Sequence, residues 1–259
     1  MLDIIDFEIA ELQAMKKYPQ YLSYIGNLEL LKKRKISIVG SRNPNQYTTQ
    51  FTAQLAYKLA QKNICIVSGC AMGVDAVAHH NAGVSNTIGV AGTGLDIRYP
   101  KINFDLIKDI EKDGLMISQF KPKTPSQKYN FPIRNETVVA LGEVLIVTQA
   151  DIKSGTMRSV EFALKMGKKI FVLPHRIGES AGTDKLLKEQ KATAIYDIDE
   201  FVNNFVGCKG DIKNKDTFLE YCKSNPTYDE AVLKYQSKVF EYELMGQIEI
   251  KDGFVVILN

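Results

Sequence analysis

The stretch "SIVGSRNPNQYT", residues 37–48, decides the fold, because an apolar run stops there at a glycine turn and a helical pattern follows. The run Ile36–Val39 is dominated by β-branched residues, which is typical of a strand. Gly40, Ser41 and Arg42 end the run, so backbone amides and a guanidinium gather at a strand-to-helix turn. Turns of this kind hold anions. The three spaced glycines of the dinucleotide fingerprint are absent, so the turn predicts an anion site of another kind.

Five more apolar runs follow, and helical patterns separate them. The six candidate strands are "ISIVG" (36–40), "ICIVSG" (64–69), "TIGVAG" (87–92), "LMISQF" (115–120), "VLIVTQA" (144–150) and "KIFVLP" (169–174). In the first intervening helix, apolar residues recur every four positions at Phe51, Leu55 and Leu59, and Thr48 or Thr49 is the expected N-cap. Buried strands joined by helical crossovers predict a doubly wound α/β domain with a mostly parallel sheet.

Small residues follow four of these strands. The turns are Gly40-Ser41-Arg42, Ser68 to Gly73, Gly92-Thr93-Gly94 and Ser154-Gly155-Thr156. Ligands of such sheets bind beyond the carboxyl ends of the strands, so the four turns together favour a phosphate-binding rim. The alternative is that each glycine only makes a tight turn between a strand and a helix.

The segment "KPKTPSQKYNFPIRNE", residues 121–136, is basic and contains aromatic residues. Its four cations against one acid give a net charge of +3, equal to that of the whole chain. The prolines favour an extended loop, with a helix expected only near Ile133 or Arg134, so that Tyr129 and Phe131 lie in the loop. Cations beside an aromatic face are what single-stranded nucleic acid requires. Alternatively, Phe131 fills the core of its own domain and Lys128 is merely solvated.

The composition changes after residue 206. The polar stretch 207–216 is the expected linker, and three helical patterns and a hairpin with an Asp252-Gly253 turn follow in residues 217–259, which predicts a winged-helix-like domain. From Asp211 onward six lysines oppose nine acids, a net charge of −3. Major-groove binding by this domain is therefore not expected, and a protein partner or a packing role is favoured.

The bulk composition, 45% hydrophobic and 24% charged, is that of a globular protein. Acidic residues interrupt the first apolar positions and no run approaches the roughly 18 residues of a membrane span, so we expect a cytoplasmic protein. The four cysteines form no C-x-x-C pair and the three histidines add no ligand spacing. We expect reduced thiols, no metal and no cofactor.

The ordered motifs resemble those of the DNA processing protein A (DprA/Smf) family, and the likeness to its epsilonproteobacterial members is close. The motifs are "YPQYLSYIGN", "IVGSRNPNQYT", "IVSGCAMGVDAVAHHNAG", "GTGLDIRYP", "FPIRNETVVAL", "SGTMRSVEFALKMGKKIFVLP" and "GTDKLLKEQKA". The resemblance implies an extended Rossmann-like domain over residues 1–206, with residues 1–35 packed on it as an N-terminal extension. It also implies a non-enzymatic single-stranded DNA-binding protein of natural transformation. Such a protein protects incoming strands, helps to load the recombinase RecA and forms homodimers through the Rossmann domain.

The resemblance also implies roles for individual residues. Arg42 and Lys128 would bind phosphates and Phe131 would stack on a base. The full predicted DNA-binding set is Gly40, Ser41, Arg42, Gly69, Gly73, Lys128, Asn130, Phe131, Arg134, Asn135, Ser154, Gly155 and Thr156. Within it, Gly69 and Gly73 would let the DNA backbone approach. Gln119 and Gln149 stand where the family usually has glutamate, and Glu136 where it usually has arginine, which predicts altered phosphate contacts near residues 134–136.

An enzymatic alternative is a nucleotide phosphoribohydrolase of the lysine-decarboxylase-like Rossmann group. Ser154-Gly155-Thr156 faintly resembles its loop, with Glu161 as the acid. The loop carboxylate should follow the threonine by three residues, but Glu161 follows Thr156 by five. A serine hydrolase is weaker still, because the nucleophile-elbow spacing is absent. Asp75 is expected to partner a helix N-terminus, and His79 and His80 to be structural or solvated.

Overall fold

The computed structural model describes residues 3–207, 217–244 and 246–257. The chain forms two compact units, Met1–Val206 and Gly207–Asn259, and each is considered by itself. Residues 208–216 of the expected linker lie outside the described residues.

The first unit is built on a nine-stranded sheet. Its strands, in spatial order, are β1 (Asp3–Ile4), β2 (Ser23–Gly26), β6 (Leu115–Ser118), β5 (Thr87–Val90), β4 (Cys65–Ser68), β3 (Lys35–Val39), β7 (Leu145–Val147), β8 (Ile170–Val172) and β9 (Thr193–Ala194). The seven strands from β6 to β9 are parallel, and β1 and β2 add an antiparallel edge. All six strands expected from the sequence are present, and the predicted fold class is confirmed.

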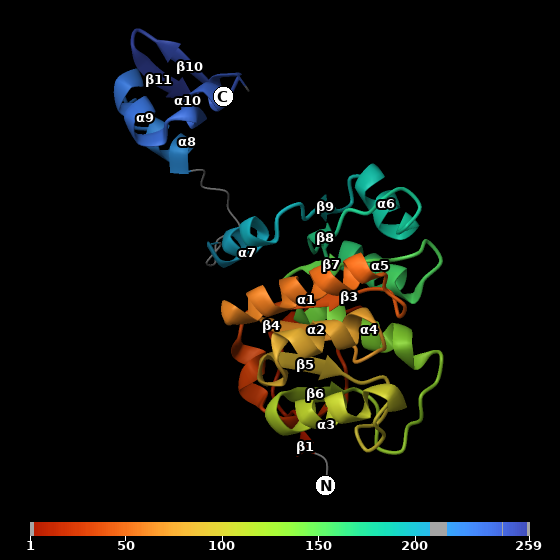
Figure 1. Ribbon diagram of the computed structural model, residues 1–259. Coiled ribbons are helices and arrows are strands. Elements are labelled where there is room, and N and C mark those ends of the chain that lie inside the picture. Colours follow the sequence, from red (N-terminus) through yellow and green to blue (C-terminus); the bar gives the residue numbers. More distant parts are fainter. Residues whose placement is uncertain (1–2, 208–216, 245, 258–259) are drawn as a thin grey trace. The chain divides into compact units, whose positions relative to one another are not determined.

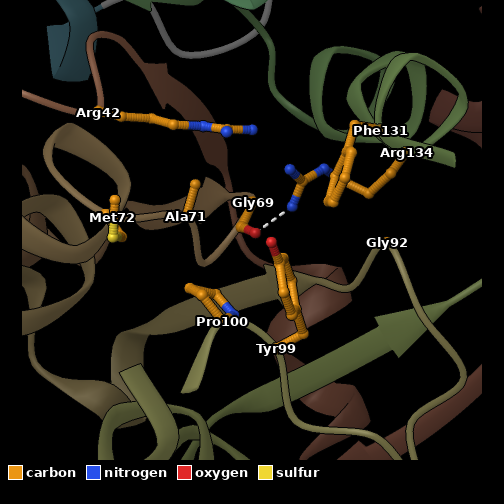
Figure 2. Close-up of a pocket in the computed structure, with 9 residues that line it drawn as sticks. All are labelled: Arg42, Gly69, Ala71, Met72, Gly92, Tyr99, Pro100, Phe131 and Arg134. Carbon is orange, nitrogen blue, oxygen red and sulfur yellow. Dashed lines mark hydrogen bonds between the residues drawn. The ribbon is translucent and has the colours of Figure 1, made fainter. Parts of the chain in front are cut away.

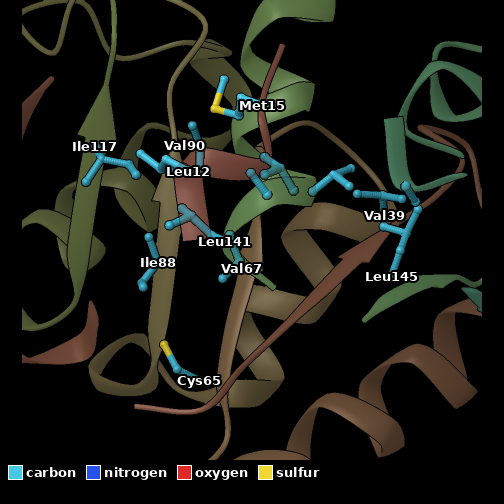
Figure 3. Close-up of a cluster of buried hydrophobic side chains, with 14 of the residues drawn as sticks. Leu12, Met15, Val39, Cys65, Val67, Ile88, Val90, Ile117, Leu141 and Leu145 are labelled. Carbon is cyan, nitrogen blue, oxygen red and sulfur yellow. The ribbon is translucent and has the colours of Figure 1, made fainter. Parts of the chain in front are cut away.

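Helices cover both faces of the sheet (Figure 1). They are α1 (Gln46–Gln61), α2 (Val74–Ala82), α3 (Phe104–Asp113), α4 (Asn130–Leu141), α5 (Gly155–Lys165), α6 (Ala181–Lys188) and α7 (Ile198–Gly207), with short 3-10 turns η1 (Ala10–Ala14), η2 (Leu28–Lys32), η3 (Val84–Asn86) and η4 (Lys101–Asn103). On β3, Ile36 and Ile38 pack toward α1, α2 and α7, while Val39 faces the opposite core. That second core, shown in Figure 3, combines α4 and α5 with the N-terminal segment.

The strand order places a topological switch point between β3 and β7. From β3 the chain moves outward through β4, β5 and β6, then crosses back to β7 on the other side of β3. The two loops that leave the carboxyl ends of β3 and β7 therefore diverge and leave a crevice between them. The Gly40-Ser41-Arg42 turn and the Ser154-Gly155-Thr156 turn follow these two strands.

Two helix starts differ from the sequence predictions. Asn45, not Thr48 or Thr49, caps α1, because its side chain accepts a hydrogen bond from the Thr48 amide. Helix α4 begins at Asn130, three residues before the predicted start. Pro132 is compatible with this earlier start because the first helical turn needs no backbone donor. Phe131 consequently projects from the first turn of a helix and not from an irregular loop.

The second unit contains three helices and a hairpin, as expected. They are α8 (Thr217–Cys222), α9 (Tyr228–Tyr235), α10 (Ser237–Leu244), β10 (Ile248–Lys251) and β11 (Phe254–Ile257). Thr227 and Glu230 form a capping box at the start of α9, and Asp252 and Gly253 take positive φ angles at the hairpin turn. The winged-helix assignment of this unit stays a prediction.

Three cysteines of the described residues, Cys65, Cys70 and Cys222, are buried, and none of the three forms a disulfide within those residues. Cys208 lies outside those residues. Within residues 3–207, 217–244 and 246–257, no helix is long and apolar enough to cross a membrane.

Candidate functional site

A groove with a volume of about 640 Å³ lies at the switch point. It is lined by the turns after β3 and β7, the start of α4 and its preceding loop, including Gly40, Ser41, Arg42, Lys128, Phe131, Arg134, Asn135, Ser154, Gly155 and Thr156. A smaller inner pocket continues from it and adds Gly69, Met72, Gly92 and Pro100 (Figure 2). Of the predicted residues, the structure thus brings together all except Gly73 and Asn130 on these two surfaces.

Arg42 projects into the groove from the turn after β3. Its side chain is exposed, and it makes neither a hydrogen bond nor an ion pair with the part of the chain that the structure describes. The turn rests on Gly73, whose φ is +77° and where an added Cβ would lie 2.4 Å from the Ser41 carbonyl oxygen. Gly73 thus makes room for the protein's own turn, and the expectation that it also admits the DNA backbone stays a prediction.

Phe131 supplies an aromatic surface beside Arg42. The Arg42 guanidinium carbon lies 5.7 Å from the centre of the Phe131 ring, within the range of a cation–π contact. Gly92 lies against the ring, since a Cβ there would be 3.0 Å from a ring carbon. The Phe131 ring is half-buried and is not part of the apolar cores formed by the described residues. It does not fill the core, which removes the structural alternative considered for it.

Arg134 is buried, with only 4% of its surface exposed. Its Nη1 donates to the carbonyl oxygens of Gly69 and Val90, and its Nε donates to Asn135 Oδ1 at 3.0 Å. A Cβ on Gly69 would overlap this guanidinium at 2.3 Å. Most of the Arg134 donors therefore form hydrogen bonds within the protein. Gly69 makes space for the Arg134 guanidinium, whereas the family resemblance implied that it lets the DNA backbone approach.

Asp75 balances the charge of Arg134 from the start of α2. Its Oδ2 accepts hydrogen bonds from the amides of Gly69 and Ala71, at 3.1 and 3.2 Å. Burial raises the pKa of Asp75 and lowers the pKa of Arg134, and the charge of each residue opposes the shift of the other. The carboxylate is occupied by two backbone amides of the loop that leads into α2, and its expected role as a helix-start partner stays a prediction.

The loop before α4 is held against the turn after β5. Both carboxylate oxygens of Asp96 accept from the Lys123 amide at 2.9 Å, and the Gly94 amide donates to the Thr124 carbonyl at 3.0 Å. Asn130, predicted to contact DNA, is 1% exposed and donates to the carbonyls of Gly92 and Pro125. Lys128 remains exposed and makes no ion pair with any described residue.

The turn after β7 forms the opposite wall at the start of α5. The Ser154 hydroxyl is buried and has no hydrogen-bond partner among the described residues. Nothing lies within 4 Å of the place where a Cβ on Gly155 would stand, so an incoming group can approach its backbone closely. Thr156 donates to the Gly40 carbonyl at 2.9 Å and ties the two walls together. An amide-rich helix start with an unused hydroxyl suits an anion.

The sequence reasoning missed several residues that line these surfaces. Tyr99, Met72 and Arg158 were not singled out, although they lie in the "IRYP" motif, the Ser68–Gly73 turn and α5, respectively. Asp151 also lines the groove. Glu136 accepts from the Lys16 amide at 2.8 Å and does not line the groove, so its carboxylate contacts the N-terminal segment.

The fold and the groove define a class, a Rossmann-like α/β protein with a cationic, aromatic-bearing groove at the switch point. The chain belongs to the family described as DNA recombination-mediator protein A, whose model matches residues 8–206. The resemblance drawn from the motifs is therefore confirmed.

Among its relatives, the chain is 35% identical to DNA processing protein DprA of Bacillus subtilis, over 71% of this chain and 67% of the relative. It is 37% identical to the DprA of Streptococcus pneumoniae, over 66% of this chain but only 62% of that protein. The fold is also similar to a solved structure of DNA processing protein A from Helicobacter pylori, determined to study that protein's single-stranded DNA binding mode. The TM-score is 0.79 at 36% identity, covering 81% of this chain and 98% of the other.

Proposed function

We propose that this protein binds single-stranded DNA in the groove between the turns after β3 and β7. One observation carries the proposal. Arg42, which makes no hydrogen bond or ion pair with the described residues, lies beside the Phe131 ring, with 5.7 Å between its guanidinium carbon and the ring centre. Single strands need both features at once, a cation for the phosphate and an aromatic face for an unstacked base. The single-stranded DNA binding described for the Helicobacter relative supports the same ligand class.

In the proposed mechanism, different walls of the groove take different parts of the strand. Arg42 and Lys128 bind phosphates, the Ser154 hydroxyl and the Gly155 backbone donate at the opposite wall, and Phe131 stacks on one base. Arg134, together with Asn130, positions the first turn of α4 from within the fold. Contacts of this kind read no base edges, so binding should be indifferent to sequence.

We further propose the cellular role that membership in this family suggests. The protein would act in the cytoplasm during natural transformation, protect incoming single strands and help to load RecA. It would act as a homodimer through the Rossmann-like unit. These roles rest on the likeness to the DprA relatives, of which the chain spans about two thirds or less.

We propose binding without catalysis. Glu161, the acid of the phosphoribohydrolase alternative, is exposed on α5 and pairs with Arg158 at 2.9 Å. Incubation with nucleoside monophosphates should leave them intact. Release of free base would favour the enzymatic alternative instead.

A salt titration tests the proposed function. The affinity for a fluorescein-labelled oligothymidine should fall as salt rises, with a log–log slope of about −1.4 or steeper, since each phosphate neutralised on a single strand contributes about −0.7. A duplex of the same length should bind more weakly because its bases are already stacked. A slope near zero, or equal affinity for the duplex, would contradict the proposal.

A further inference from the structure

Tyr99 is an exposed aromatic residue next to the proposed base-stacking site. It follows the turn after β5, 43% of its surface is exposed, and it lines both the groove and the inner pocket. It belongs to none of the apolar clusters formed by the described residues, and its hydroxyl has no hydrogen-bond partner among them. Apart from contact with the Phe131 ring, neither apolar packing nor hydrogen bonding among the described residues explains a tyrosine here.

The rings of Tyr99 and Phe131 form one surface. Their centres are 5.9 Å apart and their planes are inclined by 37°, which is the geometry of two rings in contact. No base can enter between rings that already touch. Each ring instead offers a face to a different ligand group, and both rings are among the residues that line the inner pocket in Figure 2.

An exposed cation follows Tyr99 closely along the chain. Lys101, two residues further along the chain, is exposed and makes no ion pair within the described part of the protein. Tyr99 with Lys101 thus resembles Phe131 with Lys128, since in both pairs an exposed cation stands two or three positions from an aromatic residue that lines the groove. Met72 and Pro100 add apolar surface beside Tyr99 in the inner pocket.

We infer that Tyr99 is a second stacking site, which holds the nucleotide adjacent to the one on Phe131, and that the strand continues toward Lys101. The inference rests on the proposed function and extends it. It gives the groove two base-binding positions and a path for the strand, from Phe131 past Tyr99 toward Lys101. The ligand is any unpaired base of single-stranded DNA, since every base has a face that can stack on an aromatic ring.

Variants of the full-length chain test this inference with labelled oligothymidine. Tyr99→Ala should weaken binding by roughly 5- to 100-fold, the effect expected for one lost base–aromatic stack. Tyr99→Phe keeps the ring and should bind like the wild type. Tyr57→Ala, which removes another exposed tyrosine on α1, is the matched control and should have no effect. Unchanged thermal melting of each variant would show that folding is intact.

A photo-crosslink locates the contact directly. Oligothymidine carrying 5-iododeoxyuridine should crosslink to the peptide containing Tyr99, and Lys101→Ala should reduce the salt slope by about 0.7. If Tyr99→Ala binds normally while Phe131→Ala does not, the second site is wrong but the proposed function stands. If Phe131→Ala and Arg42→Ala both bind normally, the proposed function itself fails. A loss in Tyr99→Phe equal to that in Tyr99→Ala would overturn stacking.

Discussion

At the scale of single residues, Arg134 is a cation that organises the groove from inside. Its guanidinium holds the carbonyl of Gly69, which follows β4, and the carbonyl of Val90 at the end of β5. Because Arg134 lies in the first turns of α4, these bonds fix where that helix begins relative to the sheet. The position of Phe131, three residues earlier, depends on the same bonds. We therefore interpret Arg134 as a positioning residue.

His79 is a second buried residue with a defined protonation state. The Thr87 hydroxyl donates to the Ile66 carbonyl, so it accepts from His79 Nδ1, while His79 Nε2 lies 3.6 Å from the Cys70 sulfur. Burial raises the pKa of Cys70 to about 12, so the thiol keeps its proton, and it donates to Met116 Sδ at 3.8 Å. Burial lowers the pKa of His79 from 6.5 to about 3, so the folded protein keeps this imidazole neutral.

The lowered pKa of His79 predicts a pH-dependent stability. Below pH 6.5 the unfolded chain binds a proton at His79, whereas the folded chain does not. The contribution of His79 to the free energy of unfolding is therefore complete above pH 6.5 and is lost as the pH falls toward 3. Between pH 7 and pH 5, the free energy of unfolding of His79→Gln should fall by about 2 kcal/mol less than that of the wild type. Urea unfolding at the two pH values measures the difference.

The neighbouring Asn81 provides the control for this measurement. It is exposed on the same helix and its side chain does not titrate, so Asn81→Gln should follow the wild-type profile. Parallel pH profiles for His79→Gln and the wild type would show that His79 does not stay neutral in the fold.

At the scale of elements, the groove depends on two loops that are hydrogen-bonded to each other. In the turn after β5, the Gly94 amide donates to the Thr124 carbonyl of the basic loop. The Asp96 carboxylate accepts from the Lys123 amide of the same loop. Lys123 has a φ of +65°, so this non-glycine residue occupies the left-handed region where Asp96 holds its amide. The loop that carries Lys128 is thereby ordered before any ligand arrives, which lowers the entropy lost on binding.

Asp96→Ala tests this ordering. The substitution removes both acceptors of the Lys123 amide. We expect amide hydrogen exchange in residues 121–129 to accelerate and the affinity for oligothymidine to fall about twofold to tenfold. Loss of a carboxylate near an anion site would by itself strengthen binding. A weaker affinity would therefore show that the hydrogen bonds from the Lys123 amide to Asp96 order the loop for binding. Asp105→Ala, an exposed acid on α3, should show neither effect; an Asp96→Ala variant with normal exchange and affinity would refute the role.

At the scale of the whole molecule, the fold followed from the sequence because its strands are short, apolar and separated by helices. The turns after β3, β4, β5 and β7 could be placed at one edge of the sheet, since the carboxyl ends of parallel strands share an edge. What could not be predicted was which side chains are available to bind a ligand and which form contacts only within the fold. Arg42 and Arg134 are the same residue type beside the same ring, yet one is exposed and the other is buried.

That division depends on contacts between residues far apart in the chain. Gly69 and Arg134 are 65 positions apart, and Lys16 and Glu136 are 120 apart. No local pattern reports such contacts. The start of α4 was missed for a related reason, because prolines lower the helix signal of a segment although the first turn of a helix tolerates them.

The central claim is that single-stranded DNA binds in the groove at the switch point through Arg42 and Phe131. The most direct measurement is the affinity of Arg42→Ala and Phe131→Ala for labelled oligothymidine, with Lys62→Ala as a cationic control at the far end of α1. We predict that each groove variant binds at least about fivefold more weakly, as expected for one lost charged hydrogen bond or one lost stack, while Lys62→Ala binds normally. Normal binding by both groove variants would contradict the account.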